Sequence, residues 1–220
     1  MNLPGFIIYE HIIQNYCFNL NRNLLLIFLF LFNLNCFGQQ KDYQDSIRTY
    51  IKKYVETHEV VTGTNRQYLD FYPVDEKFHV FGRFEFTKNS PWFKMETSGA
   101  EKKIFRVYGT VTFSINDTIS TLNIYQSQSL METAKYRDHL FIPFMDLTSG
   151  EETYTSGRYL DLSINDIKDH DLVIDFNKAY NPYCAYVSDR YNCPIPPREN
   201  LLKVAITAGE KQFLKKKVHN

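Results

Sequence analysis

The sequence has no excess of charge of either sign, with 25 Lys and Arg residues against 25 Asp and Glu among 220 residues. Non-specific nucleic-acid binders and polybasic membrane binders need a positive surface, so this balance argues against both classes. We therefore expect no nucleic-acid partner. The length fits one domain or two small ones, and a hydrophobic content of 44% can form a core, which excludes wholesale disorder.

The sequence also lacks an apolar run long enough to cross a bilayer, which takes roughly 20 residues. The apolar run Leu24–Phe32 follows Arg22 and precedes small residues at Cys36 and Gly38. This order is typical of a secretory signal peptide. We therefore predict a leader over residues 1–38, cleaved after Gly38, and an exported mature chain, periplasmic or extracellular, without a transmembrane segment.

A lipoprotein leader acylated on Cys36 is the alternative, although Asn35 stands where such leaders carry a small residue. Cleavage after Gly38 removes one acid, Glu10, and one base, Arg22, so the mature chain keeps its neutral balance. The argument against a nucleic-acid partner therefore holds for the mature chain as well.

Cysteine is scarce. Loss of the leader removes Cys17 and Cys36 and leaves Cys184 and Cys193. An even pair in an exported chain favours a disulfide, and free or redox-active thiols are the alternative. A structural zinc site needs four ligands, and no histidine lies between or beside these two cysteines. We expect neither a metal nor a cofactor.

The pattern of the mature chain is mainly β. Apolar residues recur at helical spacing over residues 47–55, which predicts one amphipathic helix. Alternating apolar and polar positions, rich in β-branched and aromatic residues, predict strands. The strands are expected at residues 78–86, 103–113, 121–125, 140–144, 158–162, 172–176 and 202–206.

Short turns between these strands, such as the one at Asn116-Asp117, favour antiparallel pairing, because parallel strands need long crossover connections. The predicted fold is therefore mainly β, an antiparallel sandwich or partly open barrel with one N-terminal amphipathic helix. We expect it to form a single domain over residues 39–220.

The sequence contains no H-E-x-x-H, G-x-S-x-G, P-loop or C-x-x-C motif, so a hydrolase would have to be assembled from scattered residues. Two polar and aromatic segments, residues 146–161 and 175–197, carry side chains suited to a site. Asp146 and Glu152 could act as acid and base if the fold brings them about 5–9 Å apart. Arg158 could clamp a carboxylate or phosphate.

The same segments supply a predicted ligand-binding set: Arg158, Tyr159, Asp175, Asn177, Tyr180 and Asn181. They also concentrate the chain's aromatic excess, which is 18 Phe and 16 Tyr in total, and tyrosine rings can stack on sugars or planar ligands. The local tyrosines are Tyr154, Tyr159, Tyr180, Tyr183, Tyr186 and Tyr191. The alternative is that these rings only replace aliphatic side chains in the core.

Several short motifs resemble domain-of-unknown-function family 1684, over roughly residues 43–211. They are Phe71–Asp75, Gly157–Leu160, Asp175–Asn177, Tyr180–Pro182 with Cys184, Cys193-Pro194, Pro196-Pro197, Glu199-Asn200 and Ala208–Glu210. The resemblance implies a bacterial and archaeal family without an established activity. Three functions stay open: binding of a small polar ligand or envelope glycan, hydrolysis by the carboxylate pair, and a structural envelope module without a ligand.

Overall fold

The computed structural model describes residues 41–214 of the chain. The predicted leader with Cys36 lies outside the described residues. Residues 46–214 belong to one compact unit, and the account below describes that unit together with the start of its N-terminal helix. No helix in the described part of the chain is long and apolar enough to cross a membrane.

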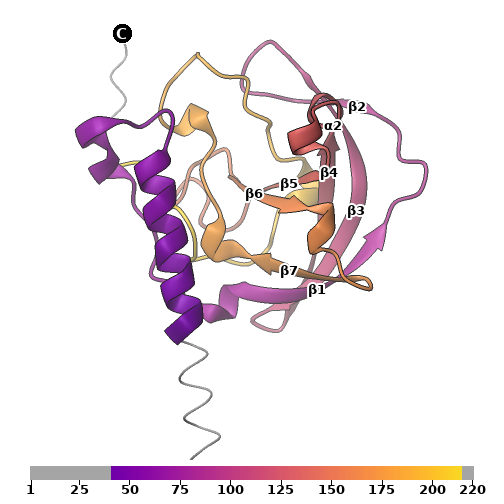
Figure 1. Ribbon diagram of the computed structural model, residues 1–220, viewed down its shortest axis with the longest axis horizontal. Coiled ribbons are helices and arrows are strands. Elements are labelled where there is room, and N and C mark those ends of the chain that lie inside the picture. Colours follow the sequence, from indigo (N-terminus) through magenta and orange to yellow (C-terminus); the bar gives the residue numbers. More distant parts are fainter. Residues whose placement is uncertain (1–40, 215–220) are drawn as a thin grey trace, which may run out of the picture. The chain divides into compact units, whose positions relative to one another are not determined.

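Seven antiparallel strands dominate the described chain and curve into a half-barrel (Figure 1). The hydrogen-bonded order is β6-β5-β4-β3-β1-β7, and β2 pairs with β3 beside this path. Their bounds are β1 (His79–Phe86), β2 (Phe93–Met95), β3 (Lys103–Ile115), β4 (Thr118–Ser127), β5 (His139–Phe144), β6 (Arg158–Ser163) and β7 (Asp171–Asp175). The predicted antiparallel, mainly β class is confirmed.

The helices are few. The N-terminal helix covers residues 41–57, and Ile47 on its apolar side is 2% exposed, which confirms the predicted amphipathic helix. A single turn, α2 (Gln128–Met131), follows β4. The remaining turns are 3-10 helices: η1 (Gly63–Tyr68), η2 (Glu76–Phe78), η3 (Ala134–Tyr136), η4 (Ile164–Asp166), η5 (Phe176–Lys178), η6 (Tyr183–Ala185) and η7 (Arg198–Asn200).

A two-residue turn joins the long strands β3 and β4, as the sequence predicts. Asn116 and Asp117 both adopt positive φ angles, 49° and 60°, and Ile115 pairs with Thr118 across the turn. Asn and Asp tolerate this left-handed backbone better than most residues, and such a turn matches the twist of the flanking strands. The turn chemistry therefore fixes the register of the hairpin.

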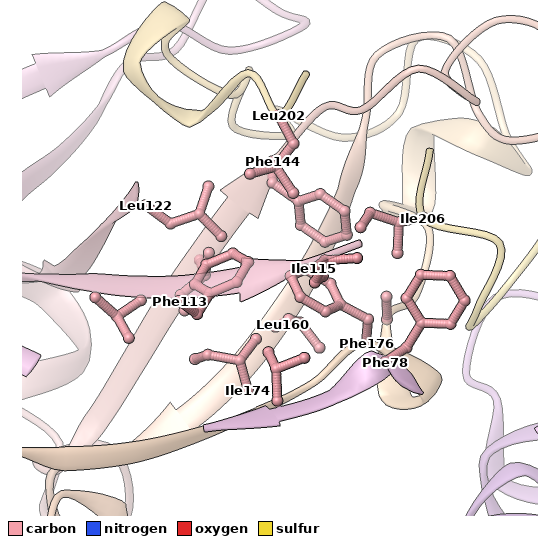
Figure 2. Close-up of a cluster of buried hydrophobic side chains, with 14 of the residues drawn as sticks. Phe78, Phe113, Ile115, Leu122, Phe144, Leu160, Ile174, Phe176, Leu202 and Ile206 are labelled. Atoms are coloured by element: carbon pink, nitrogen blue, oxygen red, sulfur yellow. The ribbon is translucent and has the colours of Figure 1, made fainter. Parts of the chain in front are cut away.

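The main hydrophobic core lies against one face of the curved sheet (Figure 2). On β5 and β6 the even-numbered residues face it, because successive side chains of a strand alternate between the two faces. Each large apolar side chain buried here contributes about 1.5–3 kcal/mol. Core members shown in the figure include Phe113, Ile115, Leu122, Phe144, Leu160, Ile174, Phe176, Leu202 and Ile206.

The strand predicted over residues 202–206 is wrong. Leu202, Val204 and Ile206 are buried at alternate positions, but the segment is irregular. Its backbone bonds to a loop and to side chains: Leu202 N–H donates to the Met145 carbonyl at 2.8 Å, and Ile206 N–H donates to Asp146 Oδ1 at 3.1 Å. Alternating burial therefore arises here without a strand partner. The sequence patterns also did not predict β2.

Candidate functional site: an aromatic cavity

A cavity of about 980 Å³ lies on the second face of the sheet, away from the main core. On β5 and β6 the odd-numbered residues His139, Phe141, Tyr159 and Asp161 line it. The strand register sets them side by side, because Phe141 is paired with Asp161 across the two strands. Alternation along neighbouring strands thus gives the cavity a base of mixed aromatic and polar character.

Five of the lining rings follow one another in contact, and we call them the aromatic floor: Tyr54, Tyr180, Tyr159, Phe141 and Phe105. Successive ring centroids are 6.2, 5.8, 4.7 and 5.7 Å apart. These spacings lie within the range of favourable aromatic pairs, which contribute about 0.5–1.5 kcal/mol each beyond their burial. The floor is therefore a rigid apolar surface that runs from the N-terminal helix to β3.

The loop that closes one side of the cavity is held by a disulfide between Cys184 and Cys193, which confirms the predicted pairing. Tyr183 and Tyr191 of this loop line the cavity with their rings 5.1 Å apart. The Cys193 carbonyl accepts a hydrogen bond from Ser98 N–H at 2.9 Å. The disulfide and this bond fix the aromatic side chains of the loop at the cavity wall.

A polar group stands beside the floor. Asp161 accepts hydrogen bonds from the Tyr180 hydroxyl, at 2.9 Å on Oδ2, and from His139 Nε2, at 2.9 Å on Oδ1. Its side chain is 49% exposed. A carboxylate offers about four acceptor positions, so two donors orient Asp161 without saturating it. His139 Nδ1 is buried and has no hydrogen-bond partner among the described residues.

His58 supplies a second polar group in the lining. Its Nδ1 accepts hydrogen bonds from Val60 N–H at 3.2 Å and Val61 N–H at 2.9 Å, so the ring proton is on Nε2. Burial, followed by the charge of Arg66, lowers the pKa of His58 from 6.5 to about 4, which keeps the ring neutral near pH 7. Nε2 is buried without a partner in the described chain, and the residue is 5% exposed.

A buried carboxyl supports the helix side of the cavity. Glu210 is fully buried and accepts hydrogen bonds from the Tyr186 hydroxyl at 2.7 Å, the Tyr54 hydroxyl at 3.2 Å and Asn181 N–H at 2.9 Å. Burial raises the pKa of Glu210 from 4.5 to about 7. Tyr54 belongs to the aromatic floor, so this network ties the floor to the C-terminal segment of the domain.

The predicted residues Asp146 and Arg158 lie inside the protein, away from the cavity. Arg158 Nη2 donates to Asp146 Oδ2 at 2.9 Å, and both side chains are inaccessible to solvent. Arg158 also donates to the carbonyls of Ile206 and Glu210, at 2.8 and 3.2 Å, and to that of Ala208. These bonds account for the irregular 202–210 segment, because the ion pair satisfies backbone groups that a strand ladder would otherwise pair.

Glu152 is not beside Asp146 in a shared cleft. It is exposed and accepts a hydrogen bond from the Tyr72 hydroxyl at 3.1 Å, whereas Asp146 is sealed in the interior. Asp146 Oδ1 already accepts from Thr148 N–H and from the Thr148 hydroxyl, at 2.8 and 2.6 Å. Neither carboxylate lines the cavity, so the geometry gives a hydrolase no facing acid and base at these two positions.

Three further predicted residues tie segments together. Asp175 Oδ1 accepts from Asn177 N–H at 3.1 Å, and the Asn177 amide exchanges hydrogen bonds with the backbone of Asp75, at 3.0 and 2.9 Å. Asn181 Nδ2 donates to the Lys211 carbonyl at 2.8 Å. These contacts join the end of β7 to the segment before β1 and to the C-terminal segment, which is a structural use of polar side chains.

Of the predicted ligand-binding set, Tyr159 and Tyr180 line the cavity, and their backbones are paired by two hydrogen bonds of 2.9 and 3.0 Å. The sequence patterns gave no role to His58, His139 or Asp161, although Asp161 is the last residue of the predicted polar segment 146–161. The signal for the last two lies in the alternation of β5 and β6, where each shares a face with an aromatic residue. Among residues 41–214, no group of three or more His, Cys, Asp or Glu side chains is placed to hold a metal ion.

The fold and the cavity define an antiparallel half-barrel domain with an aromatic site on the face opposite its core. The chain belongs to the family described as protein of unknown function (DUF1684), whose model matches residues 65–211. It is similar to the solution NMR structure of an uncharacterized protein from Haloarcula marismortui, with 26% identity and a TM-score of 0.61, over 81% of this chain and 99% of that chain. A comparison with curated proteins gave no match.

Proposed function

We propose that the protein binds a small polar ligand of the sugar class in the aromatic cavity. The observation that carries this proposal is the aromatic floor, a run of five contacting rings that lines a cavity of about 980 Å³. Small-molecule sites typically enclose about 300–1,000 Å³ and combine apolar rings with a few placed polar groups. This cavity has both features.

The chemistry of the lining suits a sugar. The C–H face of a pyranose ring can lie on an aromatic ring, while its hydroxyl groups need donors and acceptors at the edge of the floor. Asp161 provides unsaturated acceptor positions beside Tyr180. His58 provides a neutral N–H whose nitrogen has no partner among the described residues, and a buried donor without a partner costs about 1–3 kcal/mol. A ligand oxygen would relieve that cost.

We further propose that the protein is exported and that its ligand is a glycan of the cell envelope. Two features support this part of the proposal. The leader-like residues 1–38 precede the domain, and the disulfide between Cys184 and Cys193 is a type of bond that persists mainly in oxidising compartments. The measurement is cell fractionation of the natural host, in which the protein is expected outside the cytoplasm with its two cysteines protected from alkylation.

Isothermal titration calorimetry with a panel of oligosaccharides tests the binding proposal. Tyr50→Ala removes a lining ring that is 37% exposed, and Tyr136→Ala removes a ring of similar exposure, 40%, that does not line the cavity. Loss of one stacking ring is expected to weaken binding about tenfold, since such a contact is worth about 1–1.5 kcal/mol. The Tyr136 variant is expected to bind as the wild type does.

Equal loss of affinity in both variants would place the ligand elsewhere on the protein. Absence of heat with every sugar, in a protein that melts cooperatively, would overturn the proposal and favour the structural envelope module.

A further inference from the structure

The charged side chains that line the cavity are predominantly acidic. The carboxylates are Glu59, Glu101, Glu132 and Asp161, and the lysines are Lys102 and Lys103. Lys102 is engaged with Glu96, which does not line the cavity. Lys103 has no ion pair within the described chain, so it alone opposes the four acids as an uncompensated positive charge. The lining therefore favours a cationic group over an anionic one.

Asp161 is the acid best placed to receive such a group. It lies on β6, two residues after Tyr159 of the aromatic floor. Its carboxylate accepts hydrogen bonds from His139 and from the Tyr180 hydroxyl. Two donors hold the carboxylate in one orientation, yet half of the side chain stays exposed. A preoriented, unsaturated carboxylate can accept a charge-assisted hydrogen bond without losing rotamer freedom on binding.

The tyrosines of the cavity sense the same negative field. Burial, then the charges of Asp161, Asp175 and Glu210, raises the pKa of the Tyr50 hydroxyl to about 12. Burial, then the hydrogen bond and charge of Glu59, raises the pKa of the Tyr183 hydroxyl to about 12. Burial opposes any charge at these hydroxyls, whereas the contribution of the carboxylates to the two pKa shifts favours a cation placed at the same point.

Aromatic faces add to this preference. The quadrupole of a tyrosine ring attracts a cation above its face, and the effect grows where water is excluded. Tyr180 places the two attractions for a cation side by side, because its ring belongs to the aromatic floor and its hydroxyl donates a hydrogen bond to the Asp161 carboxylate. His58, which is 5% exposed, lines the same cavity, and its Nε2 has no hydrogen-bond partner among the described residues.

We infer that the sugar-like ligand carries a basic nitrogen, whose ammonium group lies between Asp161 and the aromatic floor; this inference rests on the proposed function. The ligand class is then an amino sugar with a free amine. Its hydroxyl groups and ring face use the remainder of the cavity, including the donor of His58.

Three trimers with the same β-1,4 linkage test the inference: glucose, N-acetylglucosamine and glucosamine. Only the last carries positive charge. Titrated into the protein near neutral pH at low salt, the glucosamine trimer is expected to bind about tenfold more tightly than the other two, the gain of one charge-assisted hydrogen bond. Asp161→Asn is expected to abolish this preference, so that the variant binds the three trimers with equal affinity.

Asp171→Asn is the matched control, because Asp171 is an exposed aspartate at the start of β7 that does not line the cavity. It is expected to keep the preference. A salt titration of the wild-type protein gives a measurement that needs no variant. Added salt should weaken binding of the glucosamine trimer and leave the glucose trimer unaffected, since only the first is held by charge.

The outcomes separate this inference from the proposed function. Equal binding of all three trimers, or a preference that survives Asp161→Asn, overturns the inference and leaves sugar binding in place. Binding of no sugar at all overturns both. A lysine trimer that binds as tightly as the glucosamine trimer shows that charge alone is recognised, which overturns the assignment to an amino sugar.

Discussion

Arg158 Nη2 donates a hydrogen bond to Asp146 Oδ2 across 2.9 Å, and neither side chain has any exposed surface. The pair joins β6 to the loop after β5, and through three backbone carbonyls it also holds the segment from Ile206 to Glu210. Two residues that the sequence suggested for a site thus form a structural connection. The connection positions Glu210, whose carboxyl supports the floor of the cavity.

Arg158→Ala should lower the free energy of unfolding by about 3–5 kcal/mol, because it leaves the Asp146 carboxylate buried without its partner. Urea denaturation followed by circular dichroism measures the change. Arg83→Ala is the control, since Arg83 is paired with Asp171 on the surface at 3.5 Å and exposed pairs contribute about 0–1 kcal/mol. Similar losses in the two variants would contradict the structural role given to Arg158.

The disulfide is expected to stabilise the protein and to shape the cavity wall. Replacing Cys184 and Cys193 together by Ser should cost about 2.5–3 kcal/mol, the loop-closure entropy of a loop of about ten residues. Sugar affinity should fall as well, because Tyr183 and Tyr191 on the same loop line the cavity. Unfolding with and without a reductant checks the assignment: reductant should destabilise the wild type and have no effect on the double variant.

The sequence predicted the fold better than the site. Strand positions follow from alternation, which is a local property, and six of the seven predicted strands correspond to strands of the structure. The failure at residues 202–206 has a nonlocal cause, since Leu202 bonds to the backbone of Met145 and Ile206 bonds to the side chains of Arg158 and Asp146. Alternating burial shows that a segment packs against a core, and it does not show what its N–H and C=O groups bind.

The site depends on register, which a single sequence does not supply. His139 and Asp161 are 22 residues apart and meet because β5 and β6 pair with Phe141 opposite Asp161. A shift of β6 by one residue would turn Asp161 toward the core and away from His139. His58 comes from a further segment, after the N-terminal helix. Tyr159 and Tyr180 could be proposed in advance because aromatic residues are locally concentrated, whereas their polar neighbours could not.

Gly209 is expected to tolerate no side chain. Its φ is +75°, and a Cβ there would lie 2.6 Å from the Ala179 carbonyl oxygen and 2.7 Å from that of Phe176. Gly63 is the matched control, with a φ of +57° and open space around a Cβ. Gly63→Ala should cost about 1 kcal/mol through backbone strain. Gly209→Ala should cost about 1–3 kcal/mol more than that, because the backbone at Ala179 and Phe176 must move to make room for the methyl group. Equal thermal shifts would contradict the close approach.

The carboxyl of Glu210 should make stability fall as pH rises. Burial raises its pKa to about 7 in the folded protein, from 4.5 for an ordinary glutamate. Between these two values the folded state holds a proton that the unfolded state has released. The free energy of unfolding therefore decreases from about pH 4.5 to about pH 7, by an amount on the order of 3 kcal/mol, and levels off above.

Glu210→Gln removes this titration, so the difference between wild type and variant isolates it. The subtraction is needed because His58 acts in the opposite direction. Its pKa is about 4 in the folded protein and 6.5 for an ordinary histidine, so between these values the unfolded state binds a proton that the folded state does not. The contribution of His58 to the free energy of unfolding therefore rises with pH from about 4 to 6.5. Urea unfolding of both proteins at a series of pH values from about 4.5 to 8 gives the difference curve, over the range where both titrations act. The free energy of unfolding of the wild type, relative to that of the variant, should be highest at the acidic end. There Glu210 is protonated, so no charge is buried at this position. A flat difference curve would mean that the carboxyl keeps an ordinary pKa and that the Tyr54–Tyr186–Glu210 network carries full negative charge at neutral pH.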